Sequence, residues 1–428
     1  MKDDQILKRI MTMTLSITAI VFLLAAAKAS AKEELKFTFA SASDSFSIED
    51  IPVLSETNER DADEDGLIRE SISAVDEFDD KEADPDENTW DKYATSETET
   101  IETKTVSVYD FLFGEYSERI MNVSGENAII IRKPDENAKL SISDDLLTRS
   151  LFVAIENSDD PGAISPEDIY RISGDKSLNG GWYEMSYDLV SDMKFKYRDG
   201  GNAADITITT KDYWLYKSFN IGEYYVISMQ RPKDVYDKIV VIDAGHGGWD
   251  RGALALDNVT READINLQAV TELKKILDED PDIHVFYTRL DDSYPTLDER
   301  VELANGVGAD LFISIHCNAF DKQNSNGTET LYNTKQGIGD KLNSEVLARI
   351  IVSNLVQTMG TRLRGIVSGD EIRIVRRSEV PVTLVELGFI TNRNDYKVIS
   401  DENKMKQIAE SIYKSILTAY EILETEND

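Results

Sequence analysis

The sequence predicts an α/β domain in the C-terminal part of the chain, with a twisted, mostly parallel sheet that helices cover on both faces. After residue 236, apolar runs of strand length alternate with segments of helical periodicity, which is the pattern of parallel sheets buried on both faces. Upstream, short apolar runs separated by Gly, Asn and Asp predict a small β-rich domain, and a strongly acidic stretch predicts a disordered spacer. The chain of 428 residues is long enough for two folded units with connectors.

The elements of the C-terminal domain follow from periodicity and from turn residues between the runs. Apolar runs predict strands at 238–243, 283–288, 310–316, 327–333, near 372–376, and at 382–386. Helical spacing predicts helices at 265–277, from 296 onward, at 342–359 and at about 404–423. Thr296 and Glu299 have the spacing of a capping box, which fixes the start of the second helix.

The region 106–235 is expected to be a β-rich module whose role the residues do not reveal. Its runs at 128–133, 150–156, 192–201, 205–216 and 224–230 are separated by turn-forming clusters. Tyrosines in such strands are usually packing residues, although a binding role for them stays open.

Residues 32–105 are expected to form an acidic, disordered spacer. Between Asp44 and Glu102 there are 22 acidic and 4 basic residues, so this part alone supplies about half of the formal net charge of −35. Such a stretch cannot bury enough apolar surface to offset the entropy of ordering. The phosphates of nucleic acid would repel so acidic a chain, which excludes nucleic acid as a partner.

Residues 1–31 predict a secretory signal peptide or, if uncleaved, a membrane anchor. Lys8 and Arg9 precede an apolar run of about 18 residues, and a small-x-small site follows at Ala29 to Ala31. Both alternatives place the rest of the chain outside the cytoplasm. The chain has a single cysteine, Cys317, so no internal disulfide can stabilise it.

Chemically reactive residues collect where the strands of the predicted sheet end. His246 lies just beyond the strand ending at Asp243, while His316 and Glu386 end two other strands. Glu262 opens the helix that follows the first strand, and such helices begin at the same sheet edge, where chemistry collects in parallel sheets. Two imidazoles and one carboxylate make a three-ligand zinc site that leaves one position open for water.

Each of these residues also has a purely structural interpretation. A histidine at a strand end is often just hydrogen-bonded, and a glutamate in a first helical turn complements the helix dipole. The fourth group carries more weight, because Glu386 ends an apolar strand where an ionisable group needs a reason. His284 is expected to face away from the core and is given no role. Cys317 follows His316, so its side chain points to the opposite face and is expected to be a small apolar filler.

Seven motifs in order over residues 238–423 resemble the zinc-dependent N-acetylmuramoyl-L-alanine amidases (amidase type 3), bacterial enzymes that cut peptidoglycan. The motifs are IDAGHGGWDRGA, READINL, TR (288–289), LDERVELAN, LFISIHCNA, GTETLY and VPVTLVELGFITN. Seven ordered blocks are far more specific than any one of them. The resemblance does not extend upstream of about residue 236.

The resemblance implies roles for individual residues. The metal ligands of the family fall on His246, Glu262 and His316, which would hold one Zn²⁺ ion, and its catalytic glutamate falls on Glu386. Zinc would activate a water molecule, and Glu386 would take its proton and pass it to the departing L-alanine amine. Three further residues would position the substrate or support the ligands: Asn318, Arg289 and Arg376. Asp243 and Asp250 are interpreted as turn or supporting residues.

The implied function is hydrolysis of the amide between the lactyl group of N-acetylmuramic acid and the L-alanine of the stem peptide. Two alternatives stay open: a zinc peptidase that cuts within the stem peptides, and a non-catalytic wall-binding protein. The expected partner is peptidoglycan, with no nucleic acid and with membrane contact only if the N-terminal segment is retained. We expect an exported monomer at the cell wall, in the periplasm or outside the cell, with the catalytic domain at 236–428 and a wall-targeting role open for 106–235.

Overall fold

A computed structural model describes residues 116–156, 165–173, 189–320 and 324–425 of the chain. The predicted signal peptide or anchor at 1–31 and the predicted acidic spacer at 32–105 lie outside these described residues. Within the described part, no helix has the length and apolar character needed to cross a membrane.

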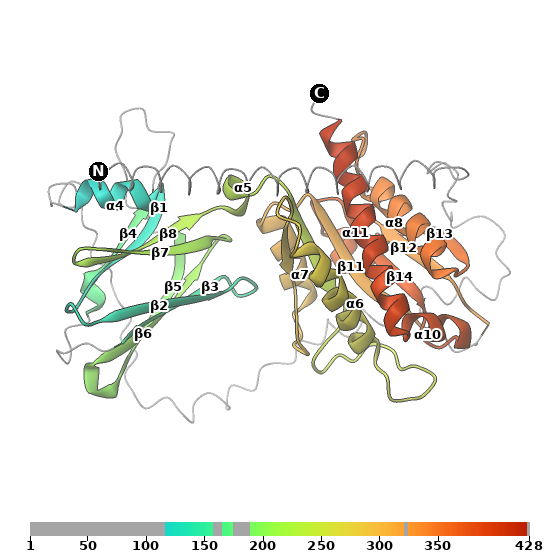
Figure 1. Cartoon of the computed structure of the whole chain (residues 1–428), viewed down its shortest axis with the longest axis horizontal. Coiled ribbons are helices and arrows are strands. Elements are labelled where there is room, and N and C mark those ends of the chain that lie inside the picture. Colours follow the sequence, from blue (N-terminus) through green and yellow to red (C-terminus); the bar gives the residue numbers. More distant parts are fainter. Residues whose placement is uncertain (1–115, 157–164, 174–188, 321–323, 426–428) are drawn as a thin grey trace, which may run out of the picture. The chain divides into compact units, whose positions relative to one another are not determined.

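In its described part, the region that precedes the α/β domain contains two antiparallel sheets and a short α-helix (Figure 1). Their strand orders are β4-β1-β8-β7 and β2-β3-β6-β5. The elements are α4 (Ser117–Ser124), β1 (Asn127–Arg132), β2 (Lys139–Asp145), β3 (Ser150–Glu156), β4 (Ile169–Ser173), β5 (Val190–Arg198), β6 (Ala203–Thr210), β7 (Leu215–Ile221) and β8 (Tyr224–Gln230). Alternate side chains of both sheets meet in one core, which includes Ile129, Val153, Ile206 and Ile227. The alternating runs of the sequence therefore form β-structure, as expected.

The α/β domain is built on one six-stranded sheet with the order β10-β9-β11-β14-β12-β13. Its strands are β9 (Ile239–Ala244), β10 (His284–Tyr287), β11 (Leu311–Asn318), β12 (Thr328–Tyr332), β13 (Leu363–Ser368) and β14 (Val382–Phe389). Neighbouring strands pair in parallel except β12 and β14, which are antiparallel. The predicted mostly parallel sheet is thus confirmed, with β12 and β13 running opposite to the other four strands.

Helices cover both faces of this sheet, as predicted. Helices α6 (Glu262–Leu277), α8 (Ser344–Met359) and α11 (Glu402–Glu424) pack on one face, and α7 (Leu297–Gly306) and the single turn α9 (Arg373–Arg376) pack on the other. Two further short helices are α5 (Pro232–Val235) and α10 (Arg393–Ile399). Figure 1 shows α6, α11 and α8 lying side by side across the strands. Thr296 caps α7 through the predicted capping box with Glu299.

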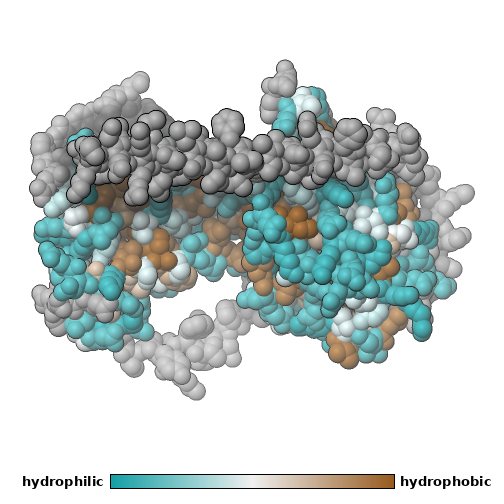
Figure 2. All heavy atoms as spheres, in the orientation of Figure 1, coloured by the Kyte–Doolittle hydropathy of each residue, from teal (hydrophilic) through white to brown (hydrophobic). Residues whose placement is uncertain are grey.

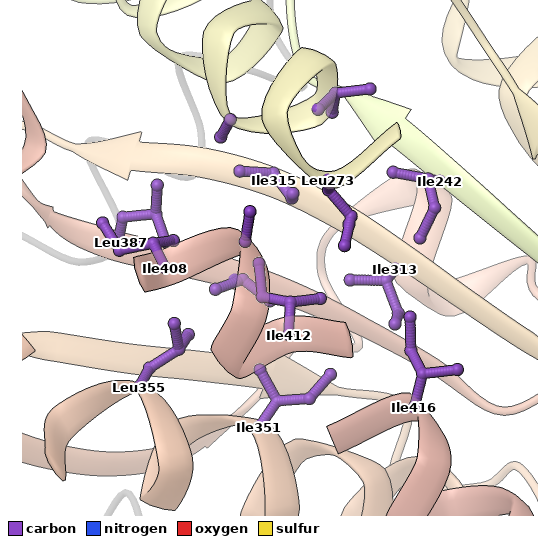
Figure 3. Close-up of a cluster of buried hydrophobic side chains, with 14 of the residues drawn as sticks. Ile242, Leu273, Ile313, Ile315, Ile351, Leu355, Leu387, Ile408, Ile412 and Ile416 are labelled. Atoms are coloured by element: carbon purple, nitrogen blue, oxygen red, sulfur yellow. The ribbon is translucent and has the colours of Figure 1, made fainter. Parts of the chain in front are cut away.

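The larger core lies between the sheet and the three helices α6, α8 and α11. Figure 3 shows Ile313 of β11, Leu273 of α6, Ile351 of α8 and Ile412 of α11 pointing into one cluster. All four side chains are fully buried. Figure 2 shows that the outer surface of these helices is mostly hydrophilic, so each helix buries one apolar face against the sheet.

One predicted strand is wrong. The segment near 372–376 is not a strand, because Arg373–Arg376 forms the single helical turn α9. Its Ile374 and Val375 pack on the sheet as side chains of that turn, and so short an apolar run fits either period. The strand that the sequence analysis did not predict is β13 at Leu363–Ser368. There Gly365, with a φ of 113°, interrupts the apolar pattern that would have identified the strand.

Candidate active site

The first candidate residue, His246, lies in a tight loop directly after β9. Its φ is 61°, a left-handed conformation that residues other than glycine rarely adopt. Arg300 Nη2 donates to the His246 carbonyl oxygen at 2.9 Å, and the ring Nδ1 lies 2.7 Å from Asp250 Oδ2. These contacts hold the backbone and the ring together, so the strained conformation is one that the surrounding structure maintains.

Two glycines of the GHGGWDRG segment make room for the candidate ligands. A Cβ on Gly245 would lie 2.1 Å from His316 Nε2, and a Cβ on Gly252 would lie 2.7 Å from Glu262 Oε2. Any side chain at these positions would displace the ring or the carboxylate. The glycines therefore do more than permit a tight turn, since they allow the loop to pack directly on the candidate ligands.

Glu262 is the first residue of α6, and His316 lies near the end of β11. Glu262 Oε2 accepts from the Ala253 amide at 3.0 Å, and its Oε1 accepts from the Cys317 amide at 3.0 Å. Oε1 also lies 3.1 Å from His316 Nδ1. The carboxylate is thereby fixed between the loop and β11, with the helix N-terminus favouring its negative charge.

The structure brings His246, Glu262 and His316 together, as the strand-edge argument predicts. One ligand atom from each lies within 4.8 Å of the others, and all three residues are buried. The Nε2 atom of His246 is buried and forms no hydrogen bond with the described residues, although it lies 3.1 Å from Glu262 Oε1. Two imidazoles, one carboxylate and an unsatisfied ring nitrogen fit a divalent ion such as zinc, and Asp250 would orient His246 from its other nitrogen.

The charges of this cluster are strongly coupled. Burial disfavours the charged form of His246, but the carboxylates of Glu262 and Asp250 outweigh it and raise the pKa of His246 to about 10. Burial also opposes ionisation of Glu262, yet His246 and His316 hold its pKa well below the usual value. For His316, burial dominates and lowers the pKa. The cluster therefore has one neutral and one protonated imidazole around an ionised carboxylate when no ion is present.

Glu386 lies on β14 directly beside His316, its register partner on β11. It is the least buried residue of β14, so part of its surface reaches solvent, but its Oε2 atom is buried. Its Oε2 atom nevertheless has no hydrogen-bond partner within the described part of the chain. Burial, followed by the negative charges of Glu262 and Glu329, raises the pKa of Glu386 well above its usual value. A proton can therefore be held on this carboxyl group next to the cluster.

A second buried carboxylate, Glu329 on β12, was missed by the sequence reasoning. It is the register partner of Glu386 and is fully buried. Asn318 Nδ2 donates to Glu329 Oε1 at 2.7 Å, and Arg364 Nε donates to Oε2 at 2.7 Å. The GTETLY strand contains this ionisable residue, which is a signal, but its partners come from other strands and are not visible in the local pattern.

The residues predicted to position substrate make structural contacts. The Asn318 amide is bonded to Glu329. Arg289 is 3% exposed, and its guanidinium donates to the carbonyls of Ala244, Gly245, Ala263 and Asp291. Arg376 donates to the carbonyls of Asp370 and Glu371. These arginines support loops, and their substrate-positioning role stays a prediction.

Asp243 and Asp250 occupy the supporting positions that the sequence predicts. Asp243 is fully buried, contacts Arg300, and accepts from Ser314 Oγ at 2.6 Å. Asp250 bonds to His246 and accepts from the Gly252 amide at 3.1 Å. Neither aspartate belongs to the cluster that could hold a metal ion.

The two residues that sequence reasoning set aside have side chains that do not belong to the ligand cluster. Cys317 is 2% exposed and belongs to the core on the helix α6 side of the sheet, as expected of a small apolar filler. His284 is half-buried on the edge strand β10, where its ring stacks on Tyr236 with 3.6 Å between centroids. Its ring thus contacts the segment that leads into the domain.

Comparison with known proteins decides the family. The profile of the N-acetylmuramoyl-L-alanine amidase family matches residues 240–418. The uncharacterized protein YqiI of Bacillus subtilis (strain 168) is 38% identical over 192 residues, which are 45% of this chain and 89% of YqiI. The chain belongs to the N-acetylmuramoyl-L-alanine amidase family. The amidase match begins at the first strand of the α/β domain and ends within α11.

Other amidases match the same part of the chain. The N-acetylmuramoyl-L-alanine amidase LytC of Bacillus subtilis (strain 168) is 32% identical over 194 residues, and the chain spans only 38% of its length. Among solved structures, the N-acetylmuramoyl-L-alanine amidase of Clostridium difficile 630 is 36% identical, with 43% of this chain and 97% of that chain covered and a TM-score of 0.41. The catalytic domain of the Bacillus (Paenibacillus) polymyxa amidase CwlV is 31% identical, with coverage of 43% and 99% and a TM-score of 0.40.

Proposed function

We propose that residues 236–428 are a zinc-dependent amidase that hydrolyses the bond between the lactyl group of N-acetylmuramic acid and L-alanine in peptidoglycan. One observation carries the proposal: two imidazoles and a carboxylate present ligand atoms within 4.8 Å of one another, directly beside a carboxyl group whose Oε2 has no hydrogen-bond partner in the described chain. Membership of the amidase family selects the lactyl amide among the bonds that such a site could cut.

In this proposal His246, Glu262 and His316 hold one zinc ion. Zinc supplies Lewis acidity for the scissile carbonyl and makes water a nucleophile at neutral pH. Asp250 keeps the proton of His246 on Nδ1, which directs Nε2 to the ligand position. Cys317 contributes no ligand, because its side chain is buried on the face of the sheet that α6, α8 and α11 cover.

Glu386 performs the proton transfers. Its carboxylate takes a proton from the attacking water and then donates it to the nitrogen of L-alanine as the amide bond breaks. The raised pKa of Glu386 suits this exchange, because a carboxyl group that binds its proton firmly is both a stronger base and a group that can hold the proton until the amine leaves. Partial exposure of Glu386 in an otherwise buried strand gives water and substrate access to it.

The location of the enzyme follows from the same proposal. Relatives from Staphylococcus epidermidis and Staphylococcus aureus that match this chain are named probable cell wall amidases. We infer that this chain also acts outside the cytoplasm on the cell wall. Residues 1–31 would direct export or anchor the chain, 32–105 would separate the domains from the membrane, and 106–235 would be a module that accompanies catalysis.

Product analysis tests the proposal. The full chain is incubated with zinc and purified peptidoglycan, and released peptides are analysed by mass spectrometry. We expect free stem peptides that begin with L-alanine, absent for Glu386→Gln and unchanged for Glu410→Gln, a matched substitution on the exposed side of α11. New termini within the stem peptide would instead identify a peptidase, and zinc binding without any product would identify a wall-binding protein.

A further inference from the structure

An exposed aromatic residue is positioned next to the candidate site by a tight hairpin. Gly247 and Asp250 exchange both backbone hydrogen bonds, at 2.8 and 3.0 Å, so Gly248 and Trp249 form the tip of a two-residue turn. Trp249 is 63% exposed, although large apolar side chains are normally buried. Gly248 has a φ of 55°, which the turn requires.

The hairpin is fixed on both sides, so Trp249 is held in place. On one side Asp250 is bonded to His246 Nδ1 at 2.7 Å. On the other side the Gly248 amide donates to Asp292 Oδ1 at 3.0 Å. Because Trp249 is three residues from His246, their Cα atoms are at most roughly 11 Å apart. An exposed indole ring is thus presented on a rigid turn at the border of the site.

Tyr294 extends this aromatic surface. Its ring centroid lies 4.4 Å from that of Trp249, with 49° between the ring planes. The close packing depends on Gly248, where an added Cβ would lie 3.0 Å from the Tyr294 Cβ. Two loops that are 45 residues apart in the sequence therefore combine to present two rings, which is unlike a tryptophan exposed by chance.

The chemistry of the proposed substrate indicates what binds there. In a muramoyl peptide, three bonds separate the scissile carbonyl carbon from the sugar ring, a span of roughly 4 Å. When the carbonyl is at the ligand cluster, the sugar and its neighbours along the glycan must lie on surfaces that border the cluster. The C–H face of a pyranose ring is apolar and matches the flat face of an indole or phenol ring.

Charge argues against the stem peptide as the occupant. Two carboxylate side chains flank the turn, since Asp250 contacts His246 Nδ1 and Asp292 accepts from the Gly248 amide. The guanidinium of Arg261, which contacts Asp292, is shared with Asp264. Carboxylates of a stem peptide would be repelled here, whereas a neutral sugar would not.

We propose that Trp249 and Tyr294 form a saccharide-binding platform that packs against a pyranose ring of the glycan strand beside the scissile lactyl amide. The platform rests on the proposed amidase function for its choice of ligand. The platform positions the glycan so that the lactyl carbonyl reaches the ligand cluster. It does not contact the reacting atoms, at which Glu386 and the ion held by the metal ligands act.

Binding and kinetics together test this platform. The zinc-loaded Glu386→Gln chain is titrated calorimetrically with a peptide-free GlcNAc-MurNAc tetrasaccharide whose lactyl carboxyl groups are capped as methylamides, and, separately, with free stem peptide. Introducing Trp249→Ala into this Glu386→Gln chain should weaken tetrasaccharide binding by about tenfold or more, as for loss of a buried aromatic contact. It should leave the affinity for the stem peptide unchanged. Trp249→Phe should retain most of the affinity. In the active enzyme, Trp249→Ala should raise KM for peptidoglycan more than it lowers kcat.

The matched control is Ile338→Ala, a substitution of an exposed apolar residue in the loop that follows β12. It should change neither affinity, and all variants should still bind one zinc ion, which shows that the site is folded. Equal tetrasaccharide affinity in Trp249→Ala, loss of peptide affinity instead, or no tetrasaccharide binding by the starting protein would each overturn the platform. If peptidoglycan is not cleaved but Trp249→Ala still loses tetrasaccharide affinity, the amidase proposal fails and the platform stands.

Discussion

Two glutamates at paired positions on neighbouring strands have different surroundings. Glu329 on β12 and Glu386 on β14 are register partners. Glu329 has no exposed surface and accepts hydrogen bonds from Asn318 and Arg364, each at 2.7 Å. Glu386 is partly exposed, and its Oε2 has no hydrogen-bond partner among the described residues.

The difference teaches which buried charge is available for chemistry. A carboxylate whose two oxygens both accept hydrogen bonds from fixed donors links the strands that carry those donors and takes part in the architecture. A carboxyl group with an unsatisfied oxygen can accept a proton, and the charge of Glu329 helps to raise the pKa of Glu386 after burial and Glu262. The fully bonded glutamate thus helps to tune the incompletely bonded one.

The largest effect is expected from exchanging each glutamate for glutamine. Glu386→Gln should lower the rate of peptidoglycan hydrolysis by about 10³-fold, since it removes the proton acceptor, without loss of thermal stability. Glu329→Gln should keep the rate within about tenfold but lower the free energy of unfolding by about 3 kcal/mol, because Arg364 loses its buried partner. Hydrolysis rates and urea unfolding curves of the two variants measure this, and equal losses of rate would break the comparison.

The buried ion pair of Asp243 and Arg300 extends the comparison to a third carboxylate. Arg300→Met should lower the free energy of unfolding by about 3 kcal/mol, because Asp243 would remain buried without a counter-charge and the His246 carbonyl would lose a donor. Denaturant unfolding in excess zinc measures the change. Lys194→Met removes an ion pair with Asp192 on β5, in which both side chains are more than half exposed, and should cost less than about 1 kcal/mol; a similar cost for both variants would contradict the distinction.

Metal removal should reveal the unsatisfied ligand atoms of the cluster. At zinc concentrations about 100-fold above Kd, the bound ion should add about 2.7 kcal/mol to the free energy of unfolding, so a chelator should lower Tm. Differential scanning calorimetry with and without chelator tests this. His316→Ala should show a smaller response or none, and an unchanged Tm in the unsubstituted chain would mean that no metal site assembles.

Proton release gives the smallest and most specific effect. In the metal-free protein the pKa of His246 is raised to about 10, so its protonated form adds stability that is full below about pH 6.5 and is lost as the pH rises through about 10. Zinc requires the neutral ring. Binding at pH 8 should therefore release about one proton, and the affinity should rise with pH up to about 10. Calorimetry in buffers of different ionisation enthalpy measures this, and buffer-independent heats would contradict it.

The sequence predicted the sheet and the cluster because both depend on local patterns. Strand periodicity locates the ends of β9, β11 and β14, and parallel strands bring those ends to one edge, so the proximity of His246, His316 and Glu386 follows. The position of Glu262 follows from the start of α6. These four residues lie together, as predicted, and their roles as ligands and catalyst are proposals.

What the sequence could not predict depends on contacts between distant segments. The antiparallel pairing of β12 with β14, which places Glu329 opposite Glu386, is a matter of register that no local pattern encodes. The same holds for Arg289, whose carbonyl partners come from other segments. The β13 strand was missed because Gly365 interrupts its apolar run. The single turn α9 was predicted as a strand because an apolar run of so few residues fits both helical and strand periodicity.

X-ray absorption at the zinc edge tests the central claim most directly, because it reports the ligands of the bound ion. The account predicts one zinc per chain with two imidazole nitrogens at about 2.0 Å and oxygen ligands from Glu262 and water. Glu386→Gln should leave this spectrum unchanged, while Glu262→Ala should abolish or weaken the bound-zinc signal. A zinc–sulfur distance of about 2.3 Å, which only Cys317 or a methionine could supply, or a spectrum without imidazole scattering would contradict the account.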